Sequence, residues 1–211
     1  VNALYNIVDR IFIGRGVDSV AIGGIYIGMP IMLVLMAFAM LIGIGGNTLV
    51  SIRLGEGKKE EADRIAANSL TMLAIVGVFL GAAGTVLLEP LLKLFGASSS
   101  NIGYAKDYLQ VILIGAPLNA IGFGMNNFIR GEGNPKIAMF TMLIGAFLNM
   151  ILDPIFIFVF DMGVRGAALA TIISQAVSAM WVLRYFLTGK SILSFKKKYL
   201  VPDLKIIKKI V

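Results

Sequence analysis

The stretch Asn149-Met150-Ile151-Leu152-Asp153-Pro154 sets an amide, a carboxylate and a proline inside a long apolar run. Asp153 is the only charged residue between Lys136 and Asp161. About 20 apolar residues, each rising roughly 1.5 Å, cross the hydrocarbon core of a bilayer, and residues 137–160 are long enough to do so. A carboxylate at that depth costs about 2.5–3.5 kcal/mol on insertion scales and usually faces a polar cavity or a partner. The stretch therefore predicts a membrane span that carries an ion or transport site.

The composition is that of a protein that crosses the membrane several times. Hydrophobic residues make up 58% of the chain and charged residues 15%, and the mean hydropathy is +0.88. These values lie far outside those of ordinary soluble domains. We therefore predict an all-α, multi-pass helix bundle in the plasma or inner cell membrane, with the lipid bilayer as its surroundings.

The residue types that are absent exclude many catalytic chemistries. The sequence has no histidine and no cysteine, so it offers no imidazole base, disulfide or thiolate ligand. Membrane aspartates without a nucleophile or a metal cluster do not make a hydrolytic site. We expect neither an enzyme nor a bound cofactor. The net charge of +7 does not indicate nucleic acid, because the basic residues flank apolar spans, where lysine and arginine set topology.

Apolar runs predict six membrane helices, the first of them incomplete. Residues 1–14 are too short to cross a bilayer, and because the chain does not begin with methionine we expect the inner half of this helix to precede it. Residues 1–187 then form the bundle, and residues 188–211 form a basic linker and the start of a further helix. The other predicted spans are Ser19–Ile52, Ile65–Leu88, Tyr108–Ile129, residues 137–160 and Gly166–Leu183.

Small residues recur at helical spacing in the second span. Ala39, Gly43, Asn47 and Ser51 stand at every fourth position, a stripe that lets a neighbouring helix approach closely. Pro30 predicts a kink, because proline lacks an N–H and crowds the preceding turn. We expect this span to serve close helix packing rather than ligand contact.

Polar residues in two other spans share one helical face. Asn6 and Asp9 lie together in the first segment, and Tyr108, Asn119 and Asn126 fall on one line of the fourth span. Such faces look into a bundle. The asparagines either line a substrate cavity or bond a neighbouring helix, and their spacing does not decide between the two.

The fifth span carries Asn149 and Asp153 one helical turn apart, with Gly145 a turn before them. The three residues predict a recessed polar notch. Pro154 cannot donate to the Met150 carbonyl, which leaves that oxygen for water, an ion or a side chain. Hydroxyl residues of the sixth span, taken alone, are typical of contacts between helices: Thr171, Ser174 and Ser178.

Basic residues are distributed unevenly between the two sides of the membrane. Fourteen of the 19 lie on one side, among them Lys196-Lys197-Lys198 and Lys208-Lys209 of the linker. By the positive-inside rule that side is cytoplasmic. The lysine-rich, amphipathic linker should lie on the membrane surface or begin another helix.

Five segments, taken in this order, are similar to the multidrug and toxic compound extrusion (MATE) family. Together they cover nearly the whole chain. The segments are Tyr5–Gly14, Arg53–Gly57, Arg130–Pro135, Asn149–Pro154 and Gly166–Thr171. Members of this family have twelve helices in two six-helix lobes, so the resemblance implies that this chain is an N-terminal lobe with the linker, and that a C-terminal lobe of the same polypeptide is its partner.

The resemblance also implies roles for particular residues. In the family, an aspartate of the first helix and an Asn-x-x-x-Asp pair of the fifth line a polar cavity linked to proton or sodium binding, with a tyrosine of helix 4 and a threonine of helix 6 nearby. The matching positions are Asp9, Asn149, Asp153, Tyr108 and Thr171. A sodium ion would be held by Asp9, Asn149, Asp153 and Thr171, and burial of two carboxylates near each other favours neutralising at least one of them.

The resulting hypothesis is a secondary antiporter that exports cationic or amphipathic drugs in exchange for H+ or Na+. One alternative is a flippase of lipid-linked oligosaccharides from the same superfamily, which would require a strongly cationic cavity. The predicted spans contain no lysine or arginine in their interiors. Another alternative is a non-transporting membrane subunit whose polar residues serve assembly only.

Overall fold

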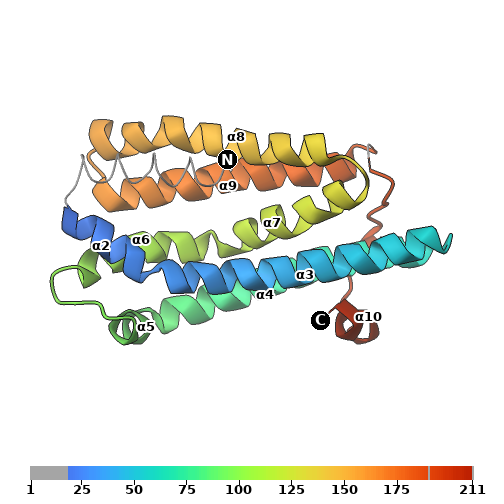
Figure 1. The fold of residues 1–211 in the computed structure, drawn as a ribbon, viewed down its shortest axis with the longest axis horizontal. Helices are drawn as coiled ribbons and strands as arrows, with labels where there is room; N and C mark the ends of the chain where they lie inside the picture. The colour runs from blue at the N-terminus through green and yellow to red at the C-terminus, as the bar shows by residue number, and fades with distance from the viewer. Residues whose placement is uncertain (1–18, 190, 211) are drawn as a thin grey trace.

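The structure is a computed structural model that describes residues 19–189 and 191–210, and these residues form an elongated bundle of helices (Figure 1). The predicted first segment, with Asn6 and Asp9, lies outside the described residues. The helices are α2 (Ser19–Ile27), α3 (Met29–Gly55), α4 (Lys59–Val86), α5 (Leu88–Leu94), α6 (Ile102–Ile114), α7 (Ala116–Gly131), α8 (Pro135–Pro154), η1 (Ile155–Val159), α9 (Gly163–Leu187), η2 (Lys197–Tyr199) and α10 (Leu204–Ile210).

The predicted all-helical membrane bundle is confirmed. Within the described residues, four stretches are long and apolar enough to cross a membrane, namely Val20–Gly55, Lys59–Val86, Pro135–Val159 and Gly163–Leu187, and the bent pair α6–α7 makes a fifth. In Figure 1, α8 and α9 run side by side along one edge, α3 and α4 along the other, and α6 and α7 lie between them. The break between α2 and α3 falls at Gly28, two residues before Pro30, as the kink prediction requires.

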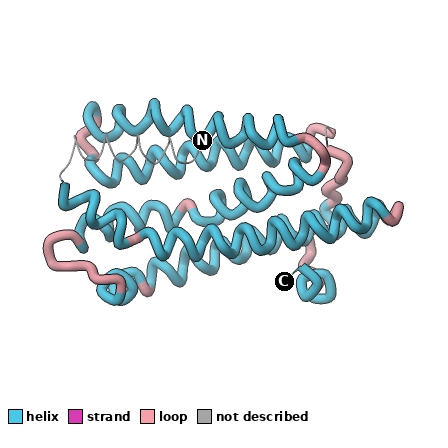
Figure 2. The backbone as a smooth tube through the Cα atoms, in the orientation of Figure 1, coloured by secondary structure: helices cyan, strands magenta, loops and turns pink. Residues whose placement is uncertain are grey.

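The predicted span Tyr108–Ile129 is present as a bent pair of helices, but the prediction that its polar residues fall on one helical line is wrong. α6 ends at Ile114 and α7 begins at Ala116, with a bend of 58° between them, and Figure 2 shows the short break in the tube. Pro117 lies in the first turn of α7, where its missing N–H costs least, and it disfavours a helical conformation of the residue before it. The residues before and after the bend therefore do not share one continuous helical face.

Glycines let α3 and α4 approach α7 and the end of α6 at backbone distance. A Cβ atom on Gly43 would lie 2.7 Å from the Gly124 carbonyl oxygen, one on Gly77 2.6 Å from Pro117 Cα, and one on Gly81 2.6 Å from the Leu113 carbonyl oxygen. These approaches confirm the predicted close packing of the second span and show that the third span packs in the same way.

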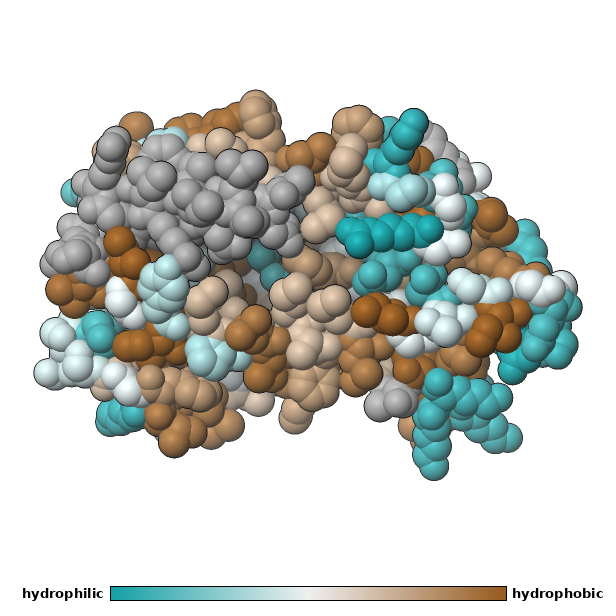
Figure 3. All heavy atoms as spheres, in the orientation of Figure 1, coloured by the Kyte–Doolittle hydropathy of each residue, from teal (hydrophilic) through white to brown (hydrophobic). Residues whose placement is uncertain are grey.

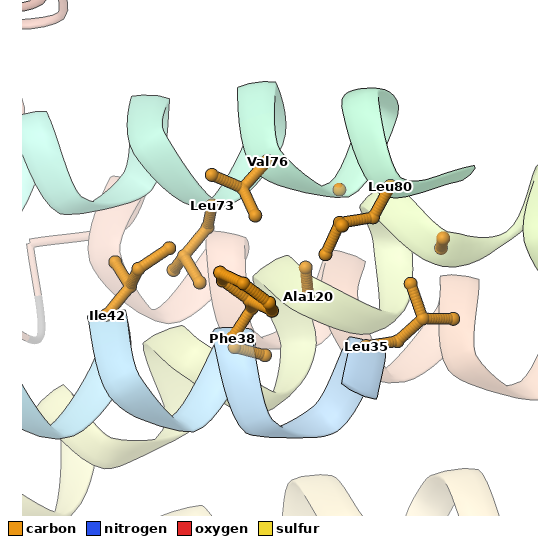
Figure 4. A pocket seen from close by; sticks show the side chains of 10 residues that line it. Leu35, Phe38, Ile42, Leu73, Val76, Leu80 and Ala120 are labelled. Carbon is orange, nitrogen blue, oxygen red and sulfur yellow. The ribbon is translucent and has the colours of Figure 1, made fainter. Parts of the chain in front are cut away.

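Apolar side chains fill the seam between α3, α4 and α7. Figure 4 shows Leu73, Val76 and Leu80 of α4 facing Phe38 and Ile42 of α3. The volume available to a water-sized molecule in this seam is about 0 Å³. The seam is therefore packing and not a substrate cavity.

Apolar and polar side chains occupy different regions of the outer surface, as expected of a membrane protein. Apolar side chains cover the middle of the visible face and hydrophilic ones gather toward its ends (Figure 3). Large apolar residues remain exposed on several helices, as expected of helices that face lipid tails. Examples are Leu33, Ile44, Phe79, Ile114 and Phe147.

Ion pairs at the end predicted to lie away from the cytoplasm join short elements. Glu89 of α5 pairs with Lys93 at 2.9 Å and with Lys106 of α6 at 2.7 Å. The hydrogen bond from Lys106, followed by that from Lys93, lowers the pKa of Glu89 to about 2, so this carboxylate stays ionised at physiological pH.

At the opposite end the linker is held by the turn between α7 and α8. The Glu132 carboxylate accepts hydrogen bonds from Tyr185 Oη at 2.7 Å, from the Ser191 hydroxyl and from the Leu193 backbone N–H at 3.4 Å. Asn134 Nδ2 in turn donates to Tyr185 Oη at 2.9 Å. A single carboxylate thus joins the turn, the end of α9 and the start of the linker.

The N-terminal part of α4 holds the linker further along. The Asp63 carboxylate, 5% exposed, accepts the Ser194 backbone N–H at 2.9 Å. Asn68 donates to the Tyr199 carbonyl at 3.2 Å and accepts the Asp203 N–H at 2.7 Å, so it is a satisfied structural amide. The predicted linker boundary near residue 188 stays a prediction, but residues 191–210 are tied to the bundle.

We expect Gly43→Ala to loosen the bundle. The new methyl group would meet the Gly124 backbone, which cannot move aside as a side chain can, in addition to the Asn127 side chain, and such overpacking costs about 1–3 kcal/mol. The measurement is the melting temperature of the detergent-purified chain. Gly55→Ala, in the same helix with open space around it, is the control and should not lower the melting temperature. Equal melting temperatures for the two variants would show that the α3–α7 contact contributes nothing.

We expect Glu132→Ala to release the linker, because the variant removes the acceptor of the Tyr185, Ser191 and Leu193 bonds. Trypsin should then cut faster at Lys196–Lys198, as followed by gel densitometry. Glu56→Ala, in another turn at the same end, removes a carboxylate that binds only Arg53 and Lys58 among the described residues, and should leave the rate unchanged. A cutting rate that does not respond to Glu132→Ala would contradict the anchoring role.

Candidate functional site

The predicted Asn149–Asp153 pair is buried in the seam between α8 and α9 and meets Thr171 of α9. The three residues are at most 1% exposed. Asn149 Nδ2 donates to Asp153 Oδ1 at 3.1 Å and to Thr171 Oγ1 at 3.4 Å. Thr171 Oγ1 donates its own proton to the Ala167 carbonyl at 3.0 Å. The amide therefore bridges the carboxylate and the hydroxyl of the neighbouring helix.

Small residues bring α8 and α9 close enough for this contact. A Cβ on Gly145 would lie 3.4 Å from Ser178 Cβ, and the Ser178 hydroxyl donates to the Thr141 carbonyl at 2.9 Å. Near the start of α9, a Cβ on Gly166 would lie 2.8 Å from the Phe156 carbonyl oxygen. α9 therefore packs closely against α8 on one side of the Asn149–Thr171 contact and against η1 on the other. The predicted notch at Gly145 is filled by Ser174 and Ser178 of α9.

The helix that carries Asp153 changes its winding directly after Pro154. Residues Ile155–Val159 form a π-helix, and the Phe160 N–H donates to the Ile155 carbonyl at 3.0 Å. π-type turns inside helices are rare and frequently occur at functional sites. Asp153 therefore lies at a junction where the backbone pattern changes, not in the middle of a uniform helix.

Three buried polar atoms of the seam have no hydrogen-bond partner among residues 19–189 and 191–210. They are Asn149 Oδ1, Ser174 Oγ and Gln175 Oε1. Buried polar groups are normally satisfied, and an oxygen left over beside a carboxylate can accept a proton donor or coordinate a cation. The arrangement provides carboxylate, amide and hydroxyl oxygens, which suit a proton or a hard cation such as sodium.

The other predicted residues occupy different surroundings. Tyr108 is 2% exposed and belongs to an apolar cluster that contains Ile157 and Ala167, the residue whose carbonyl accepts the Thr171 hydroxyl. Asn126 donates to the Ala138 carbonyl at 3.0 Å and to the Thr141 hydroxyl, so its amide ties α7 to α8.

Asn126 therefore bonds a neighbouring helix, which is one of the two roles that its spacing had left open. Its two hydrogen bonds give no support to the other role, lining a substrate cavity. Asn119 is partly exposed in α7, past the bend. Asp9 and Asn6 fall outside the described residues, so the proposed proximity of Asp9 to Asp153 stays a prediction. Within the described part of the chain, no group of three or more acidic residues could hold a metal ion.

Gln175 is the polar residue of the seam that the sequence reasoning did not single out. It follows Ser174 and stands one helical turn after Thr171. This spacing is the signal that could have identified it. Ser174, interpreted from sequence as an interhelical contact, is 3% exposed and lacks the partner that such a role requires within the described residues.

Comparison with known proteins establishes the family. A family model described as MatE matches residues 1–155, and the chain belongs to the MATE family of membrane transporters. It is 35% identical over 207 residues to a multidrug export protein MepA of Staphylococcus saprophyticus, covering 98% of this chain and 46% of the relative. It is 30% identical over 210 residues to MepA of Staphylococcus aureus strain MRSA252, covering 47% of that protein. The chain spans about half the length of the curated relatives it matches.

Solved structures agree with this assignment. The chain aligns with the crystal structure of MATE in the bent conformation with a TM-score of 0.92 at 30% identity, over 99% of this chain and 47% of that one. It aligns with an outward-facing and an inward-facing conformation of multidrug resistance MATE family transporters of the MOP superfamily, each with a TM-score of 0.91 and 30% identity, covering 46% and 48% of those chains. The predicted fold, half of a larger helical transporter, is thereby confirmed.

We expect Thr171→Val to destabilise the seam. The substitution keeps the shape but removes the acceptor of Asn149 Nδ2, and a buried donor left without a partner costs about 1–3 kcal/mol. Thr188→Val is the matched control, because this exposed threonine at the C-terminal end of α9 makes the same kind of bond to the carbonyl four residues earlier, at 2.8 Å. Melting temperatures of the purified variants make the comparison. An unchanged Thr171→Val protein would mean that the Asn149–Thr171 bond does not stabilise the seam.

Proposed function

We propose that this chain forms one lobe of a secondary antiporter that exports cationic or amphipathic compounds in exchange for protons or sodium ions. The observation that supports the proposal most strongly is the carboxylate of Asp153, 0% exposed within a membrane-spanning helix and bonded to Asn149. The MepA relatives are multidrug export proteins, which suggests the class of cargo.

The surroundings of Asp153 explain how an ion would bind there. An ionised carboxylate in an apolar interior is costly unless it is paired with a charge, and the Asn149 amide is a neutral donor that offsets only part of that cost. A proton on the Asp153 carboxylate would remove its net charge. A sodium ion bound by this carboxylate, Asn149 Oδ1 and Thr171 Oγ1 would do the same. Binding of either ion would therefore stabilise the conformation in which α8 and α9 enclose the ion.

The two conformations found among the neighbours bear on how such an ion could drive transport. The lobe of this chain matches an outward-facing and an inward-facing transporter equally well, at a TM-score of 0.91. This is the pattern expected when a lobe moves largely as a rigid body and the access of its central site alternates. An ion and a cargo that favour different states would then be exchanged.

The observations do not favour the two alternatives. A flippase for a pyrophosphate-linked lipid requires cationic groups in its cavity, whereas every lysine and arginine within residues 19–189 and 191–210 whose burial is assigned is at least partly exposed. A subunit that serves assembly only should have its buried polar atoms paired, yet Asn149 Oδ1 and Ser174 Oγ have no partner in the described chain.

We expect Asp153→Asn, introduced into the transporter that contains this lobe, to abolish ion-driven efflux. The amide keeps the shape but can neither release a proton nor neutralise a sodium ion. Ethidium efflux from inverted membrane vesicles, with an imposed proton or sodium gradient, measures the effect, and we expect activity to fall at least tenfold. Asp161→Asn changes an exposed carboxylate in the turn after the π-helix and serves as the control, with activity unchanged. Gradient-driven efflux by the Asp153→Asn protein at the control rate would refute the proposal.

A further inference from the structure

A groove lies at the cytoplasmic end of α4, where the linker crosses it. Its volume is about 610 Å³, within the range of small-molecule sites. Arg64 and Asn68 of α4 form one wall, and the linker from Lys198 to Ile206 forms the other. The groove is separated along α4 and α8 from the Asp153 seam, and nothing in the proposed transport cycle uses it.

Positive charge dominates this groove. Arg64, Lys198 and Lys205 all line it, and no carboxylate in the described part of the chain forms an ion pair with either lysine. Arg64 shares the exposed Glu60 at 3.5 Å, and Asp203 is the acidic residue in the lining. Asp203 Oδ1 is engaged in accepting the Lys205 backbone N–H at 2.8 Å. The groove thus keeps cationic side chains available for an anion.

Three cationic side chains lie close to the aromatic ring of Tyr199, and two of them, Arg64 and Lys198, line the groove. Arg64, Lys196 and Lys198 lie 5.4, 5.7 and 4.8 Å from the ring centroid. The ring itself is fixed, because Tyr199 Oη donates to Glu60 at 2.8 Å and the Tyr199 carbonyl accepts from Asn68 at 3.2 Å. The attraction of the ring for each cation partly offsets the repulsion between the cations, and it keeps them close to one another.

The linker backbone is held in place on the wall of α4. Thr71 Oγ1 donates to the Leu200 carbonyl at 2.9 Å, and Asn68 Oδ1 accepts the Asp203 N–H at 2.7 Å. The groove is therefore formed without a ligand, which reduces the entropy lost on binding. It is a built feature of the fold rather than a chance arrangement of surface lysines.

Apolar side chains adjoin the basic ones. Val201 and Leu204, both in the lining, are 69% and 71% exposed, while Ile210 at the end of α10 is 4% exposed and packs against Gly45 of the membrane-spanning α3. Hydrophilic side chains project from the region of α10 in Figure 3. A soluble anion would need only the cations. Exposed apolar residues beside them, next to lipid-facing helices, fit a ligand with a charged head and acyl chains.

We propose that this groove binds the phosphate headgroup of an anionic phospholipid from the cytoplasmic leaflet. Lys198, Lys205 and Arg64 meet the phosphate, and Val201 and Leu204 lie along the start of the acyl chains. The bound lipid fastens the linker and α10 to the membrane surface beside α4. This inference does not depend on the proposed transport activity.

The test is native mass spectrometry of the detergent-purified full chain with added palmitoyl-oleoyl phosphatidylglycerol or palmitoyl-oleoyl phosphatidylcholine. The wild-type chain should retain phosphatidylglycerol in preference to phosphatidylcholine. Lys198→Gln combined with Lys205→Gln should weaken this retention roughly tenfold or more, the effect expected of two lysines close to an anionic headgroup. The same pair changed to arginine should retain the lipid, which separates loss of charge from loss of fold.

A double variant of equal net charge is the control. Lys59→Gln with Lys136→Gln removes two exposed lysines of the same side that do not line the groove, and it should bind phosphatidylglycerol like the wild type. Equal retention by the two glutamine doubles would overturn the proposal, as would equal retention of the two lipids by the wild type. Competition by millimolar sn-glycerol 3-phosphate that displaces the lipid fully would assign the site to a soluble phosphate and overturn the lipid assignment.

Discussion

The fold depends on backbone contact between helices at glycine. In a bilayer, lipid tails are as apolar as leucine, so burying an apolar face against another helix yields little, and association relies on close van der Waals packing. Gly43, Gly77 and Gly81 provide that packing, because a methyl group on any of them would lie 2.6–2.7 Å from backbone atoms of the α6–α7 pair. Glycine also allows close packing at the bend between α6 and α7, since a Cβ on Gly115 would lie 2.5 Å from the Ile172 side chain of α9.

The candidate ion site is a consequence of this packing on the other side of the bundle. Gly145 and Gly166 let α8 and α9 approach on both sides of the Asn149–Thr171 contact. Only at that separation can an amide on one helix reach a hydroxyl on the next, and only then is Asp153 removed from lipid and water together. The same small residues that bring the helices together therefore create the desolvated surroundings that the proposed binding of a proton or a cation requires.

Local spacing was enough to predict part of this site. The contacts between residues far apart in the sequence could not be predicted from it. Asn149 and Asp153 share a face because they stand four residues apart in one helix, and the structure joins them at 3.1 Å. Thr171 came from family resemblance, since no spacing rule relates residues 22 positions apart. The bend was missed although Pro117 signalled it, because apolar periodicity continues through the break. The contacts of Glu132 and Asp63 with the linker span more than 50 residues, and polar groups in turns show no periodicity from which such pairs could be predicted.

The likeness of this chain to relatives in both conformations bears on how an ion at Asp153 could act. A bound ion shifts a conformational equilibrium only by its difference in affinity for the two states. Because this chain matches inward-facing and outward-facing neighbours equally, the proposed mechanism places that difference in small changes within the α8–α9 seam or at the face that would meet a second lobe. In the span that carries Asp153, backbone bonds already depart from the α pattern in the π-helix, which begins two residues after Asp153. A change of winding there would move the carboxylate without separating the contacts of Gly43, Gly77 and Gly81 with the α6–α7 pair.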